Sequence, residues 1–176
     1  MIPRRCWAPL LVAVLVFSMG AGEVLCTAVD TEVSAGNNFA AWTPSSWRQT
    51  AQLDFAAGTG VNVDLATFPG SIILASTGTG TFTSAVHDAG TDGAKFDHAF
   101  WDRTLPSSTT VSLEIRVSDN LSFGEPDAGW QVLGSGTYAS LEGTEGRYAQ
   151  WRAVLTSDSP GVTPVLEEVR IYYRPV

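Results

Sequence analysis

The stretch TTVSLEIRVS, residues 109–118, decides the fold class of this 176-residue chain. Its apolar positions alternate with polar ones, and they are Val111, Leu113, Ile115 and Val117. Successive side chains of a β-strand point to opposite faces, so this alternation predicts a strand with one buried and one exposed face.

Short strands are also predicted on both sides of this stretch. They are TFTSAVHDA at 81–89, AKFDHAFWDRTL at 94–105, GWQVLGSG at 129–136, RYAQWRAVLTS at 147–157 and PVLEEVRIYYR at 164–174. Turn-forming residues separate these stretches, and none of them has a helical period over a useful length. The chain is therefore predicted to be all-β, with an antiparallel β-sandwich over residues 78–176.

The N-terminal part is predicted to lie outside this domain. Residues 1–28 have the features of a helical signal peptide, because Arg4 and Arg5 precede the apolar run LLVAVLVFSMGAG and small residues follow it. An uncleaved membrane anchor is the alternative, although the run is shorter than the roughly 20 apolar residues that a spanning helix needs. Residues 29–77 are rich in proline and glycine and are predicted to form an extended arm or linker with short strands.

Charge and cysteine content exclude several classes of function. The formal net charge is -8, so no basic surface is expected that would neutralise the phosphates of nucleic acid. Cys6 and Cys26 both lie in the predicted leader. The mature chain would then have no disulfide and no thiolate metal site.

Two tryptophans are candidate ligand-binding residues. Trp130 follows an acidic loop, and Trp101 lies in a predicted strand. An exposed indole could stack on a sugar ring, because both surfaces are apolar and directional. Packing in the core is the alternative for each of them.

Acidic residues near a predicted turn form a candidate calcium site. HDAGTDGAKFD, residues 87–97, brings Asp88, Asp92 and Asp97 together, and calcium binds six to eight oxygen ligands. A second acidic loop, residues 118–127, contains Asp119, Asn120, Glu125 and Asp127. Ordinary turn chemistry is the alternative, because aspartate and asparagine favour turns. Calcium is the one cofactor that the sequence suggests.

The histidines give little support for catalysis. His87 and His98 each lie beside an aspartate, but no strand-turn-helix elbow surrounds a serine, and a third metal ligand at a recognisable spacing is missing. The chain is therefore predicted not to be an enzyme.

Two parts of the chain resemble known families. AVDTEVSAGNNFAAW, residues 28–42, resembles the leader junction of the TasA/camelysin family, with matching positions at Asp30, Thr31, Glu32, Ser34, Gly36, Asn37 and Phe39. That resemblance implies secretion to the cell surface or to an extracellular biofilm matrix, and fibre formation by donation of an N-terminal strand to a neighbouring subunit.

GTFTSAVHDAG, GRYAQWRAVLTS and TPVLEEVRIYY, within residues 78–175, resemble the galactose-binding-like jelly-roll modules of secreted bacterial and archaeal proteins. Such modules bind sugars, bind proteins or separate other domains.

These observations lead to two functional hypotheses. The first is a secreted, non-enzymatic protein of the cell surface or matrix that acts in adhesion or assembly, with like subunits or other surface proteins as partners and residues 30–76 as the donor strand. The second is a carbohydrate-binding module that uses Trp130 and Trp101 to bind glycans. In both, the membrane is a partner only through the leader before cleavage.

Overall fold

The computed structural model describes residues 44–123 and 129–176. These residues belong to one compact unit, Ala41–Val176. The predicted signal peptide and the motif that resembles the TasA/camelysin junction lie outside the described residues. Within the described part of the chain, no helix has the length and apolar character needed to cross a membrane.

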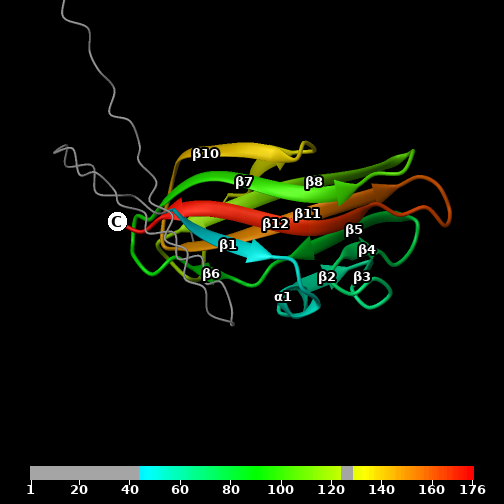
Figure 1. The fold of residues 1–176 in the computed structure, drawn as a ribbon, viewed down its shortest axis with the longest axis horizontal. Helices are drawn as coiled ribbons and strands as arrows, with labels where there is room; N and C mark the ends of the chain where they lie inside the picture. Colours follow the sequence, from blue (N-terminus) through cyan, green and yellow to red (C-terminus); the bar gives the residue numbers. More distant parts are fainter. Residues whose placement is uncertain (1–43, 124–128) are drawn as a thin grey trace, which may run out of the picture. The chain divides into compact units, whose positions relative to one another are not determined.

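Two antiparallel sheets make up the described unit (Figure 1). We call the first one sheet A; its strand order is β10 (Tyr138–Glu145), β7 (Lys95–Thr104), β12 (Val165–Arg174), β4 (Ile72–Leu74) and β3 (Val63–Asp64), and β1 (Ser45–Gln49) also pairs with β12. Sheet B has the order β2 (Thr59–Val61), β5 (Gly78–Thr83), β11 (Tyr148–Ser157), β8 (Thr109–Ser118) and β9 (Gln131–Gly134), and β6 (His87–Asp88) pairs with β11. The predicted all-β, sandwich-type fold is confirmed.

The core lies between the sheets and uses the inward positions of each strand. The predicted inward residues Val111, Leu113 and Ile115 of β8 are fully buried, as are Trp151 and Leu155 of the neighbouring β11. Because β8 and β11 pair along ten positions, their buried side chains form continuous rows. The alternation that predicted these strands therefore corresponds directly to the core.

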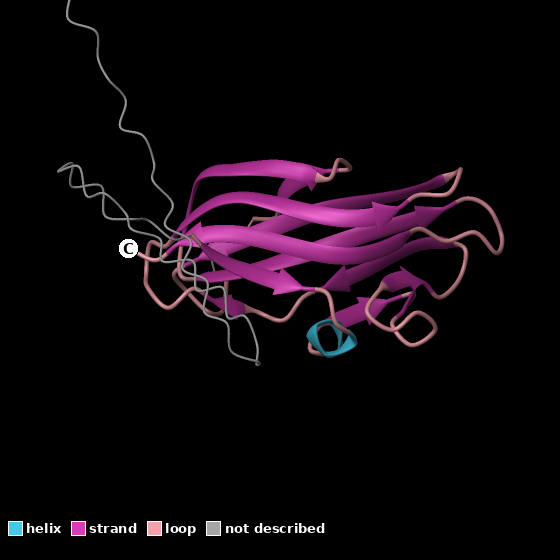
Figure 2. Cartoon of the chain, viewed as in Figure 1, coloured by secondary structure: helices cyan, strands magenta, loops and turns pink. Residues whose placement is uncertain are grey.

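A short helix, α1 (Gln52–Ala56), is the one described helix, and it closes one part of the core (Figure 2). Its residue Phe55 is fully buried, and the ring meets those of Phe82 and Trp151 edge-on, with centroids 5.9 and 6.4 Å away. The carboxylate of Asp54 accepts hydrogen bonds from the backbone N–H groups of Thr50 and Ala51, which caps the first turn.

Residues 45–77, predicted to lie in an arm with short strands, do form short strands, but these strands belong to the two sheets of the sandwich. β1 and β4 pair with β12, and β2 pairs with β5, so this segment contributes to both sheets. Ile72 is fully buried in the core. The proline and glycine residues that suggested a linker lie between short strands, whose apolar residues are needed to complete the core. The sandwich therefore begins at or before Ser45, and the strands predicted to be donated already pair within their own chain.

Gly80 shows why the glycine-rich stretch TGTGTFT is part of a strand. A Cβ atom there would lie 2.5 Å from the backbone oxygen of Asn62 and 2.6 Å from Cδ2 of Leu74. Only glycine lets β5 approach Asn62 and Leu74 so closely.

Candidate functional site

Four ring-bearing side chains gather on the outer face of sheet A. We call His98 and Phe100 of β7, Tyr138 of β10 and Tyr172 of β12 the aromatic cluster. Phe100 lies directly opposite Tyr138, and His98 lies directly opposite Tyr172. Directly opposed residues of antiparallel strands share a face of the sheet, so pairing of three strands brings together residues that are far apart in the sequence.

The rings of the aromatic cluster are in mutual contact and remain open to solvent. The centroids of Phe100 and Tyr138 are 5.0 Å apart, and those of His98 and Tyr172 are 4.6 Å apart. These separations fall within the range of about 4.5–7 Å in which aromatic pairs attract each other. Phe100 is nevertheless 42% exposed and Tyr138 is 54% exposed. A surface of this kind is suited to stacking on an apolar face of a ligand.

A hollow of about 340 Å³ adjoins the aromatic cluster at Phe100. Its lining residues are Phe100, Trp101, Asp102, Thr137, Glu168 and Arg170. Small-molecule sites commonly occupy about 300–1,000 Å³, so this hollow is at the small end of that range. It combines one exposed ring with several polar side chains.

The charges beside the hollow are mostly engaged with one another. Arg48 donates two hydrogen bonds of 2.9 Å to the carboxylate of Glu168, and Arg170 also forms an ion pair with Glu168. The pKa of Glu168 is below its usual range, mainly because its carboxylate accepts hydrogen bonds from Arg48. Among the described residues, no side chain or backbone group forms a hydrogen bond or ion pair with the carboxylate of Asp102. Asp102 is therefore the carboxylate of the hollow that is free to accept hydrogen bonds from a ligand.

Trp101 borders the hollow but belongs to the core. Only 2% of its surface is exposed. Its indole Nε1 is buried and has no hydrogen-bond partner among the described residues. Trp101 therefore packs in the core and offers little ring surface for the stacking that the sequence predicted.

Trp130 lies just before β9, in sheet B, and is covered by arginines. The guanidinium carbons of Arg116 and Arg152 are 4.7 and 4.5 Å from its ring centroid. Arg152 is also paired with Glu114, which fixes its position. Burial, and secondarily repulsion from Arg152, lowers the pKa of Arg116. The two predicted ligand-binding tryptophans are thus on different sheets, and the ring of Trp130 already has cationic partners.

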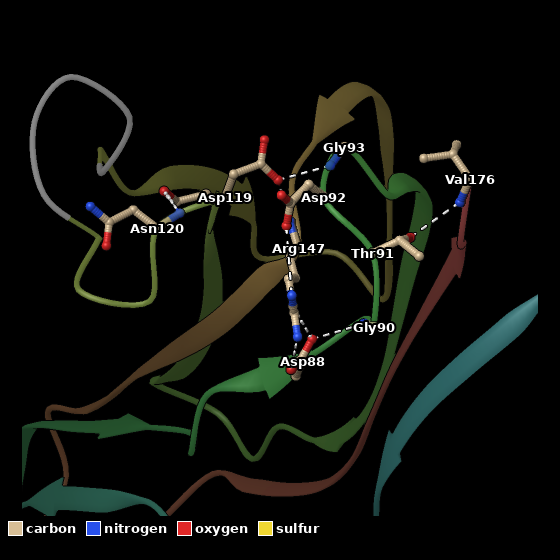
Figure 3. A network of polar contacts seen from close by, with 10 residues as sticks. Asp88, Gly90, Thr91, Asp92, Gly93, Asp119, Asn120, Arg147 and Val176 are labelled. Atoms are coloured by element: carbon tan, nitrogen blue, oxygen red, sulfur yellow. Dashed lines mark hydrogen bonds and ion pairs between the residues drawn. The ribbon is translucent and has the colours of Figure 1, made fainter.

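Arg147 pairs with two aspartates of the predicted calcium site, Asp88 and Asp92 (Figure 3). Asp88 accepts hydrogen bonds of 2.9 and 3.0 Å from Arg147, and Asp92 lies 3.8 Å from the same guanidinium. Its hydrogen bonds from Arg147 are the main reason that the pKa of Asp88 is lowered. Asp97 lies elsewhere and accepts from Arg174.

In the second predicted acidic loop, backbone N–H groups are the partners of Asp119. Asp119 accepts hydrogen bonds from the backbone N–H groups of Gly93 and Arg147, at 2.8 and 2.9 Å (Figure 3). Glu125 and Asp127 lie outside the described residues. Over residues 44–123 and 129–176, no three His, Cys, Asp or Glu side chains come together in a way that could hold a metal ion. The calcium prediction thus gains no support from these residues.

The two histidines have different surroundings. The ring of His87 is stacked on that of Trp47 at 4.7 Å, and burial lowers its pKa. His98 belongs to the aromatic cluster. In the described parts of the chain, neither imidazole forms a hydrogen bond with a nucleophilic or acidic side chain. The arrangement favours packing for His87 and ligand contact for His98.

A second hollow, of about 400 Å³, lies where β8, β9 and β10 meet. Its lining residues are Ile115, Arg116, Val117, Ser118, Asp119, Gly129, Gln131, Gly143, Thr144 and Glu145. None of these described lining residues has an aromatic ring. This hollow offers hydrogen bonds but no stacking surface, so the outer face of sheet A is the better candidate site.

Phe100, Tyr138 and Tyr172 were not among the predicted site residues. The alternation in AKFDHAFWDRTL does place His98 and Phe100 on one face of a strand and Trp101 on the other. The contribution of Tyr138 and Tyr172 depends on which strands become neighbours, and the sequence pattern carries no signal for that.

Two of the three comparisons with known proteins found no match. No protein-family model matches the chain, and no curated protein sequence matches it. A solved structure similar to this chain is chitosan-binding module 1 of a chitosanase/glucanase from Paenibacillus sp. IK-5, with 14% sequence identity and a TM-score of 0.31. The match covers 75% of this chain and 96% of that module. A likeness of this size carries no argument about ligand or site.

Proposed function

We propose that this protein is a non-catalytic carbohydrate-binding module and that it binds glycans with the outer face of sheet A. The observation that carries the proposal is the exposed aromatic cluster beside a hollow with a free carboxylate. It is the second of the two sequence-based hypotheses, with different residues: Phe100, Tyr138, Tyr172 and His98 take the place of Trp130 and Trp101.

The chemistry of a pyranose ring matches this arrangement. One face of the ring presents C–H groups, which pack well on the exposed rings of Phe100 and Tyr138. The ring edge carries hydroxyl groups, and the Asp102 carboxylate and the Thr137 hydroxyl of the hollow can bond with them. Apolar stacking then supplies affinity, while the polar groups orient the sugar.

The carboxylates of the hollow support binding rather than hydrolysis. Glycosidases use two carboxyl groups, one of which acts as an acid and has a raised pKa. Asp102 and Glu168 lie opposite each other on β7 and β12, but the arginines beside Glu168 lower the pKa of that carboxyl. Glu168 is therefore poorly suited to donate a proton at neutral pH.

The proposed location is outside the cell. It rests on the leader-like residues 1–28 and on the motif at 28–42, which stay predictions. Polysaccharides of envelopes and matrices are found there, so binding of glycans would also produce adhesion. Fibre assembly by strand donation remains a prediction that depends on residues before Ser45.

A glycan array tests the proposal, followed by affinity measurements on the array's positive glycans. We expect Phe100→Ala and Tyr138→Ala each to weaken binding about tenfold or more, since each removes a stacking ring. Val132→Ala is the matched control, because Val132 is 68% exposed on sheet B and its loss should leave binding unchanged. An array without positive glycans, or equal binding by all three variants, would contradict the proposal.

A further inference from the structure

We infer that the glycan is uncharged and spans more than one sugar residue, with one residue in the hollow and another over the pair of His98 and Tyr172. This inference rests on the proposed function and adds the class of ligand. Three observations support it: the balance of charge at the face, the direction in which the rings extend, and the way in which Tyr172 is held.

The charges beside the hollow cancel. Glu168 lies between Arg48 and Arg170, so these three groups leave one positive charge. Asp102, opposite Glu168 in the strand register, supplies one negative charge. Because these four charges sum to zero, a carboxylate or an ammonium group on a sugar meets an attraction and a repulsion of similar size at the hollow. Charge on the sugar therefore brings no net gain there, while it still loses hydration on binding.

The rings extend from the hollow along β7. Asp102, Phe100 and His98 occupy alternate positions of this strand, so their side chains emerge on one face about 6.6 Å apart. Tyr138 widens the cluster beside Phe100, and Tyr172 widens it beside His98. A ligand that filled only the hollow would leave the His98–Tyr172 pair unused. A chain that runs along β7 contacts both.

Tyr172 is positioned before a ligand arrives. Its hydroxyl accepts a hydrogen bond of 3.2 Å from Nη1 of Arg170, and its ring packs against that of His98 at 4.6 Å. A ring held on two sides loses little conformational freedom when it binds. This arrangement favours a role for Tyr172 in extending the binding surface.

Isothermal titration of the full chain tests the class of ligand. The uncharged probes are cellohexaose, mannohexaose and xylohexaose; the charged probes are hexagalacturonate and the hexamer of glucosamine. We expect an uncharged probe to bind tightest, with a Kd that changes less than about twofold between about 0.02 and 0.5 M NaCl, because screening acts only on charged pairs. The acidic protein could attract the glucosamine hexamer over a distance, but that attraction should disappear at high salt.

The outcomes of this titration distinguish failure of the inference from failure of the proposed function. If a charged probe binds tightest and its affinity falls steeply with salt, the inference is overturned while the proposed function stands. If none of the probes binds and the glycan array is also without positive glycans, both are overturned. If an uncharged probe binds tightest at both salt concentrations, the inference is supported.

Variants separate the two parts of the face. Asp102→Asn keeps the hydrogen-bonding oxygen and removes the charge, so it should change the affinity for the uncharged probe less than about threefold, whereas Asp102→Ala should cost about tenfold. Tyr172→Ala should weaken binding of the uncharged hexasaccharide that binds tightest and leave binding of a disaccharide of the same sugar unchanged. Thermal unfolding of each variant verifies that it is folded. Loss of binding with Asp102→Asn, or equal loss for both ligand lengths with Tyr172→Ala, would contradict the inference.

Discussion

The aromatic residues on the outer faces of the two sheets differ in how far they are exposed to solvent. On sheet A, Phe100 and Tyr138 are 42% and 54% exposed. On sheet B, the guanidinium of Arg116 lies over the rings of both Phe123 and Trp130, 4.3 and 4.7 Å from their centroids. Both faces carry aromatic and arginine side chains. What distinguishes them is whether the arginines cover the rings.

The arginines of the two faces have different partners. On sheet A, Arg48 and Arg170 both pair with Glu168, and Arg170 also donates to the hydroxyl of Tyr172. On sheet B, Arg152 pairs with Glu114 and Arg116 bonds to Gln150, and both guanidinium groups lie over the ring of Trp130. The faces therefore differ in where the guanidinium groups lie relative to the rings, not in whether the arginines have a carboxylate partner.

The largest effect on stability is expected from substitution of Trp101, the inward neighbour of Phe100 on β7. Trp101→Ala should lower the free energy of unfolding by about 3–5 kcal/mol, because it empties a large buried volume. Phe100→Ala should lower it by about 1 kcal/mol or less, because that side chain is half-exposed. Urea unfolding of both variants measures the contrast. A stable Trp101→Ala protein that has lost glycan binding would show that Trp101 contacts the ligand after all.

An intermediate effect is expected from Trp130 on sheet B. Trp130→Ala removes the ring that lies under Arg116 and Arg152, and each such contact contributes about 0.5–1 kcal/mol. The free energy of unfolding should therefore fall by about 1–2 kcal/mol, with glycan affinity unchanged. Trp130→Phe is the control and should restore part of the stability. A loss of affinity without a loss of stability would move the binding face to sheet B.

The smallest effect on stability is expected from substitution of His87, the half-buried counterpart of His98 on the aromatic face. Burial lowers the pKa of His87, so the unfolded chain binds its proton more readily than the folded one. Stability is then complete above the unfolded pKa of about 6.5 and decreases as the pH falls below it.

His87→Phe keeps a ring against Trp47 and removes the titration. The Tm should therefore fall less between about pH 7 and pH 5 for His87→Phe than for the unchanged protein. His98→Phe serves as the comparison on the exposed face. An identical decline in the unchanged protein and in His87→Phe would show that other groups cause the acid sensitivity.

Part of the fold and little of the site could be predicted from the sequence. The alternation in residues 109–118 and 147–157 predicted two central strands, because each has one buried face. Residues 45–77 were expected to hold short strands outside the sandwich, and their place within it was missed because it depends on pairing with β5 and β12, which lie later in the sequence. The site was missed for another reason: its rings come from β7, β10 and β12, whose pairing depends on the whole topology.

The sequence by itself determined that this chain builds strands, that the core takes the inward residue of each pair, and that the chain carries a formal net charge of -8. These are local or additive properties, since they depend on periodicity and on summed charge. Only the tertiary structure decided that Trp101 is buried and that Trp130 is covered by arginines. It also decided that His98, Phe100, Tyr138 and Tyr172 share one open face, because exposure and proximity arise only when strands distant in sequence pair and pack.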